Sequence, residues 1–83
     1  RDIDWMLHVN PALRRKGMLV VYNPLTRPVE KTLRVNLYYT GLRDTARIRC
    51  QDGPSKDYPI DRDYGVRLPV RVEPESMTWF VIE

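Results

Sequence analysis

From residue 17 onward, apolar and polar residues alternate in short runs that turn residues separate. A period of two places successive side chains on opposite faces of a sheet, so these runs predict β-strands that are buried on one face. Three runs, 32–37, 46–50 and 66–72, show the period most clearly. Their apolar positions are Leu33, Val35, Leu37, Ala46, Ile48, Cys50, Val66, Leu68, Val70 and Val72.

Two further segments, Met18–Tyr22 and Met77–Ile82, are apolar at nearly every position. Such runs are typical of strands that are covered on both faces. We expect each to supply core on one face and, on the other, either more core or an interface with a second body. The short segment 56–60 predicts an edge strand. Pro69 has no backbone N–H, so it places its strand at a sheet edge or at a bulge.

The first sixteen residues follow a looser pattern. Trp5, Leu7 and Val9 occupy alternate positions, which predicts a strand or a packed arm. An Asn-Pro pair, a basic stretch and a glycine follow, and this order fits a brief helix of about one turn or a loop. We therefore expect residues 1–16 to form an arm or linker that packs on a sandwich core made by residues 17–83.

The elements add up to six or seven short strands with no amphipathic helix of useful length. This pattern favours an all-β fold, a two-layer antiparallel β-sandwich, with Greek-key links as one way to connect the strands. A small barrel is the alternative. The chain has 83 residues, of which 42% are hydrophobic, and this suits a single domain with a thin core.

Composition narrows the function classes only a little. The net charge of +3 is mild, and both signs are spread along the chain. No apolar run approaches the ~20 residues that cross a bilayer, so we expect no membrane partner. The first residue is Arg1 rather than Met, which suggests an excised or processed piece. The single cysteine, Cys50, excludes an intrachain disulfide and is expected to be a small buried hydrophobe, in phase with Ile48.

The residues that could carry catalysis do not form a recognisable pattern. The only histidine, His8, lies between apolar neighbours, and both serines sit in turns. A Ser-His-Asp site is therefore not expected. The spacing Asp61-x-Asp63-x-Gly65 resembles the start of a calcium loop, but it lacks the downstream glutamate and is more typical of a turn. We predict no catalytic residue, no metal site and no cofactor.

Five arginines occupy polar positions of the predicted strands. If their strands share a sheet, they form a basic stripe of the kind that binds nucleic acid, but aromatic residues that would stack bases do not interleave with them. A solvated face paired with acids, or a charged docking face, explains them as well. Nucleic acid is therefore an unlikely partner. The arginines are Arg34, Arg47, Arg49, Arg67 and Arg71.

Aromatic rings also bind sugars, because a flat ring covers the apolar face of a pyranose. Tyr39 and Tyr64 are the better candidates for carbohydrate contact, since both lie where a predicted strand meets a turn. Packing in the core or at an interface is the alternative for such rings.

One stretch of the chain, 16–24, resembles the opening of the C-terminal β-sandwich domains that follow the catalytic barrel in bacterial glycoside hydrolases. The shared features are a glycine, an apolar strand and an Asn-Pro pair. The segments 33–37, 39–42 and 46–48 are similar to the elements that come next in those domains. The end of the chain, 68–83, resembles their closing hairpin. The likeness covers about four-fifths of the chain.

The resemblance implies a non-catalytic accessory domain of a carbohydrate-active enzyme. Its partner would be the catalytic domain of the parent chain, with assistance to polysaccharide binding as a second role. Trp5 and Leu7 would then lie at the link and contribute to interdomain packing. A periplasmic or extracellular location follows if the parent is a bacterial glycoside hydrolase. Two alternatives from other classes stay open, a free-standing carbohydrate-binding module and a small basic β domain for nucleic acid.

Overall fold

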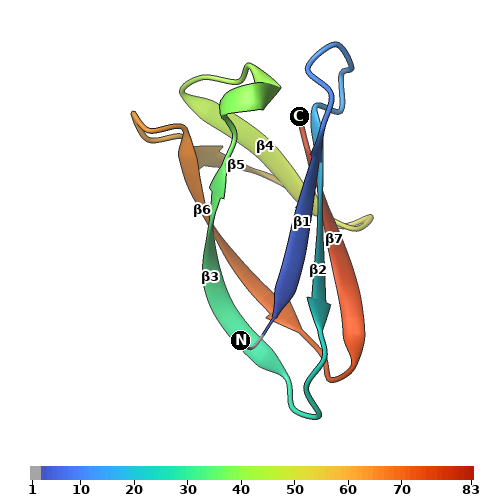
Figure 1. Cartoon of the computed structure of the whole chain (residues 1–83). Helices are drawn as coiled ribbons and strands as arrows, with labels where there is room; N and C mark the ends of the chain where they lie inside the picture. The colour runs from blue at the N-terminus through green and yellow to red at the C-terminus, as the bar shows by residue number, and fades with distance from the viewer. Residues whose placement is uncertain (1–2) are drawn as a thin grey trace.

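The computed structural model describes residues 3–83, which form seven β-strands and one short 3₁₀ helix (Figure 1). The number of strands agrees with the six or seven predicted from the alternation. The elements in chain order are β1 (Asp4–Val9), β2 (Gly17–Asn23), β3 (Val29–Asn36), η1 (Tyr38–Thr40), β4 (Thr45–Cys50), β5 (Ser55–Pro59), β6 (Gly65–Val72) and β7 (Ser76–Ile82).

The strands form two antiparallel sheets that pack face to face. The larger sheet has the order β1-β2-β7-β4-β5, and the smaller one pairs β3 with β6. The chain crosses between the sheets four times, at β2–β3, β3–β4, β5–β6 and β6–β7. The predicted two-layer sandwich is therefore confirmed, and the sheets do not close into a barrel. The predicted edge positions of β5 and of the strand that contains Pro69 are also confirmed.

The core lies between the two sheets and uses the apolar positions that the alternation predicts. In β3 and β6 the residues of one phase are buried, with the exception of Lys31, and most of those of the other phase are exposed. Burial of this apolar surface is the main favourable term in folding. The largest fully buried apolar side chains are Leu19, Val21, Val35, Leu37, Val66, Leu68, Val72 and Ile82.

The strands β2 and β7 lie inside the larger sheet. Their continuous apolar runs predict cover on both faces, but within the domain only one face of each is well covered. In β2, Leu19 and Val21 point into the core and are fully buried, whereas Met18 and Tyr22 are exposed. In β7 the side chain of Trp79 is likewise exposed. The second apolar face of these strands therefore points away from the sandwich.

Residues 4–9 form a strand of the sheet, one of the two forms expected for this segment. β1 pairs with β2 along its whole length, with Trp5 opposite Val21 and Val9 opposite Gly17. The following residues form a loop rather than a brief helix. Asn10 Oδ1 accepts the N–H of Ala12 at 3.1 Å, so this side chain stabilises a turn instead of a continuing helix.

The Asn-Pro pair at the end of β2 anchors the turn that follows the strand. Asn23 is fully buried, and its Nδ2 donates to the carbonyl oxygens of Arg27 (2.8 Å), Val72 (3.0 Å) and Glu73 (3.1 Å). Its Oδ1 accepts the N–H of Leu25 at 2.9 Å. One side chain thus closes the β2–β3 turn and ties it to the end of β6, which joins the two sheets at this end of the sandwich.

The prediction that Cys50 is buried is wrong. Cys50 is in phase with Ala46 and Ile48, as expected, but its side chain is exposed at the end of β4. The reason is that the smaller sheet has only two strands and covers only part of the five-stranded sheet. The Sγ atom lies 3.4 Å from Thr78 Oγ1.

Candidate interaction surfaces

The outer face of β1, β2 and β7 is apolar. The strand register aligns Met6, Val20 and Trp79 in one row across the three strands. Met6 is 60% exposed, and Met77 at the end of β7 is 58% exposed. We call this surface the apolar face, and its members are Met6, Met18, Val20, Tyr22, Met77, Trp79 and Val81. Within it Val81 is buried and Val20 half-buried, and the remaining five side chains are exposed. Contiguous exposed apolar patches mark interaction sites in soluble proteins.

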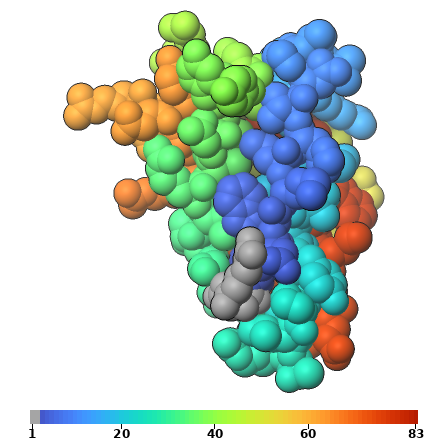
Figure 2. Space-filling model, in the orientation of Figure 1, coloured from blue at the N-terminus to red at the C-terminus, as the bar shows by residue number. Residues whose placement is uncertain are grey.

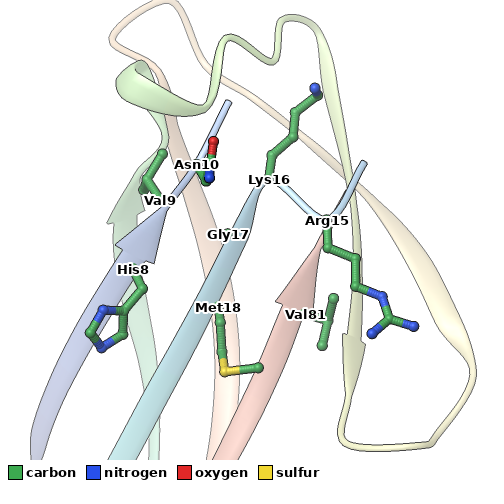
Figure 3. A pocket seen from close by; sticks show the side chains of 8 residues that line it. All are labelled: His8, Val9, Asn10, Arg15, Lys16, Gly17, Met18 and Val81. Carbon is green, nitrogen blue, oxygen red and sulfur yellow. The ribbon is translucent and has the colours of Figure 1, made fainter. Parts of the chain in front are cut away.

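A hollow of about 210 Å³ lies at one end of the apolar face (Figure 3). His8, Met18 and Val81 lie side by side on neighbouring strands and line it. The side chain of Arg15, from the loop before β2, lies beyond Val81 at its margin. The hollow therefore combines an apolar floor with a basic margin, and a partner side chain could insert into it.

Charged residues bound the apolar face on the side of β4. Arg49 lies opposite Val81 in the sheet and pairs with Glu83 at 3.0 Å. Farther out, Arg47 pairs with Asp57 of β5 at 3.3 Å. An apolar centre with a polar margin is the usual layout of a protein–protein interface.

The outer face of the smaller sheet has the opposite character. Its members, which we call the charged face, are Glu30, Thr32, Arg34, Arg67, Pro69 and Arg71. Arg71 pairs with Glu30 across the strands at 2.8 Å and with Glu73 at 3.0 Å. These two acids, Glu30 first, raise the pKa of the Arg71 guanidinium above its ordinary value.

The five outward arginines do not form one stripe. Arg34, Arg67 and Arg71 belong to the smaller sheet, whereas Arg47 and Arg49 belong to the outer face of the larger one. Counting partners among residues 3–83, all except Arg67 pair with an acid. The arrangement fits solvated faces paired with acids and offers no continuous track for a nucleic-acid backbone.

The two tyrosines singled out in the sequence lie in one aromatic cluster. The ring of Tyr38 lies edge-on to that of Tyr39, with centroids 5.1 Å apart, and edge-on to that of Tyr64, at 5.0 Å. Tyr38 lies between the two and contacts both rings. We call these three residues the tyrosine cluster. They line a hollow of about 360 Å³ together with Pro11, Gly41, Leu42 and Arg43.

The cluster is held in place by the backbone beneath it. Leu37 is buried, and its N–H donates to the carbonyl oxygen of Tyr64 at 2.8 Å. Thr40 is also buried, and its Oγ1 donates to the Leu37 carbonyl at 2.6 Å. Gly41 ends η1 with φ +78°, a conformation that favours glycine. These contacts fix η1 against the turn that carries Tyr64.

Three loops meet at this end of the sandwich. Pro11 comes from the loop after β1, Tyr39 from η1, and Tyr64 from the turn before β6. Figure 2 shows the loop after β1 (blue) beside the green atoms of the segment around η1 at the top of the view. The sequence gives no direct signal for this meeting, because the loops are far apart along the chain.

The segment that resembles a calcium loop is a turn closed by its own donors. The Asp61 carboxylate accepts the N–H groups of Asp63 (2.8 Å) and Gly65 (2.9 Å) and pairs with Arg34 at 3.3 Å. The Gly65 bond contributes most, with Asp63 and Arg34, to holding the pKa of Asp61 below its ordinary value. The carboxylate is therefore already satisfied by the protein.

Trp5 and Leu7 lie on the inner side of β1, opposite in phase to Met6. Leu7 is half-buried and packs against the core, whereas Trp5 is 41% exposed near the edge of the sandwich. The structure thus places Leu7 in the fold of the domain itself. The apolar face is formed instead by the outward side chains of β1, β2 and β7.

The candidate catalytic residues lie apart. His8 is exposed on β1, Ser55 begins β5, and Ser76 Oγ donates to the carbonyl of Pro74 at 2.9 Å. Among residues 3–83 there is no group of three or more His, Cys, Asp or Glu side chains that could hold a metal ion. Within the same residues no helix is long and apolar enough to span a membrane.

Comparison of the chain with protein-family models, with curated proteins and with solved structures finds no match. Its function therefore has to be inferred from its own surfaces and residues.

Proposed function

We propose that the chain is a non-catalytic accessory domain of a bacterial glycoside hydrolase and packs through its apolar face on the catalytic domain. The observation that carries this proposal is the apolar face itself. Three adjoining strands place methionine, valine, tyrosine and tryptophan side chains outward, over a sheet whose inner face is already packed. An isolated domain gains nothing from that arrangement, whereas an interface buries it.

The composition of the apolar face suits a folded protein partner. Aromatic residues and methionine are enriched in interfaces, and the exposed members of the apolar face are Tyr22, Trp79 and three methionines. The face also includes β1, the strand nearest to the start of the chain. A domain joined on the N-terminal side would therefore be held next to this surface. The sequence resemblance supplies the identity of that domain, a glycoside hydrolase barrel.

The test has two parts. The reading frame upstream of Arg1 is expected to encode a barrel with two acidic catalytic residues, and its absence would remove the identity of the partner. In the polypeptide that contains both domains, Met18→Glu is expected to weaken docking by at least about tenfold, because the interface would bury an unpaired charge. Limited proteolysis between the domains and the melting temperature of the catalytic domain would report the loss.

The matched control is Thr32→Glu, which adds the same charge on the charged face. Both positions are exposed in the isolated chain, so both variants should keep its fold. If the two variants behave alike in the larger polypeptide, or if the isolated chain forms a dimer that Met18→Glu abolishes, the proposed docking is wrong.

A further inference from the structure

The tyrosine cluster shares no residue with the apolar face and has a chemistry of its own. We infer that it is a binding site for a pyranose unit of a glycan, with Tyr39 as the stacking surface and Arg43 as the hydrogen-bond donor. This site adds a ligand to the proposed function but does not depend on it, because the two surfaces share no residue.

The geometry of the rings suits stacking. Tyr39 is 78% exposed, and its edge-to-face contact with Tyr38, at an interplanar angle of 90°, limits the rotation of its ring. Tyr38 is in turn braced by Tyr64 at 86°. A ring that is held in position before the ligand arrives loses less entropy on binding. The hydrophobic face of such a ring matches the C–H groups on the apolar face of a pyranose.

The exposed rings are not required for packing. Leu37 and Thr40, on either side of the two tyrosines, already anchor η1 to the core and are buried. Tyr64 adopts φ +63°, a backbone conformation that is uncommon for a bulky residue and that recurs at ligand sites. The hollow of about 360 Å³ falls within the usual range for small-ligand sites.

The charge of the hollow indicates which glycans it favours. Arg43 is the one charged residue among those that line it. Within residues 3–83 the Arg43 side chain makes no hydrogen bond or ion pair, so its guanidinium donors are available to a ligand. Hydroxyl groups and, more strongly, a carboxylate would accept from them. We therefore expect uronic-acid glycans to bind more tightly than neutral ones.

Stacked bases of a single-stranded nucleic acid would use similar rings. That class of ligand also needs several cations along a groove to follow the phosphates. The hollow offers one, and four of the five outward arginines on the two sheets are paired with acids. The observations therefore favour the glycan.

The test is calorimetric or NMR titration of the 83-residue chain with a galacturonic-acid trimer and with a neutral glucose trimer. Tyr39→Ala should weaken binding of both about tenfold, and Tyr39→Phe should retain it, because the ring remains. Arg43→Gln should weaken binding of the acidic trimer more than binding of the neutral one, because the charge that favours the carboxylate is lost. Tyr22→Ala, on the apolar face, is the matched control and should change neither affinity.

Three outcomes would overturn this site: no binding of either trimer at millimolar concentration, binding that Tyr39→Ala leaves unchanged, or Tyr39-dependent binding of single-stranded DNA that falls steeply with salt. Met18→Glu separates the two proposals, because it should disrupt docking and leave sugar binding intact. A failure of the glycan site would therefore leave the docking proposal standing, and the reverse also holds.

Discussion

Met6, Val20 and Trp79 form a row across the outer face of the larger sheet, whereas Glu30 and Arg71 face each other across the outer face of the smaller one. Both rows lie on the far side of a well-packed core. They differ in how favourably water hydrates them. Ion pairs on the charged face are solvated and contribute little to stability, while the apolar face is exposed at a free-energy cost.

The apolar character of the outer face of the larger sheet is not explained by the fold. Both sheets bury the same kind of inner face, so the fold does not require the outer residues of the larger sheet to be apolar. A surface that the fold does not need, and that water disfavours, is best explained by a partner that covers it.

The substitution that we expect to destabilise the fold most lies in β2, and the residue before it serves as its control. Leu19 is fully buried in the core, and Met18 is 43% exposed on the apolar face. Leu19→Ala should lower the free energy of unfolding by about 3 kcal/mol, because it removes core contacts and leaves a cavity. Met18→Ala should cost less than about 1 kcal/mol. Urea unfolding of both variants measures the difference.

Equal losses of unfolding free energy for Leu19→Ala and Met18→Ala would contradict the distinction between a buried core and an exposed apolar face. They would mean that the apolar face is a second part of the core rather than a surface for a partner. A loss of stability that appears for Met18→Ala only when the catalytic domain is attached would instead support docking through the apolar face.

The sequence predicts the inner faces of the sheets well, for a physical reason. Where polar and apolar residues alternate, as around Leu33 and Val70, the phase alone determines which side is buried. Where both phases are apolar, as in β2 and β7, the pattern cannot choose between core and interface. That choice depends on which strands the second sheet covers, and the pairing of distant strands decides it.

The same limit applies to the surface sites. Tyr39 and Tyr64 could be selected one at a time, because each follows or precedes a strand. Their meeting around Tyr38 depends on the hydrogen bond between Leu37 and Tyr64, which joins two loops that the chain separates. Cys50 shows the reverse case, since its phase was predictable and its exposure was set by the width of the smaller sheet.

The next effect in size concerns the side chain that joins the two sheets. Asn23→Ala should lower the free energy of unfolding by about 2 kcal/mol, because the buried carbonyl of Val72 loses its donor. Asn10→Ala is the matched control, since Asn10 also precedes a proline and also accepts the N–H two residues on. Asn10 is exposed, so its replacement should cost less than about 1 kcal/mol. Thermal unfolding of the two variants would show a gap, and equal melting temperatures would contradict the role of Asn23.

The smallest effect depends on pH and involves Asp61, which pairs with Arg34 of the charged face. The N–H groups of Gly65 and Asp63, and the Arg34 guanidinium, lower the pKa of Asp61 in the folded chain. The unfolded chain therefore binds a proton at Asp61 more readily than the folded one, so the stabilisation is present above the ordinary pKa and is lost as the pH falls below about 4. In Asp61→Asn this contribution to the acid sensitivity should disappear. Urea unfolding should show a smaller difference in unfolding free energy between pH 7 and pH 3 for the variant than for the unchanged chain. An equal difference would mean that Asp61 does not contribute to the pH dependence of stability.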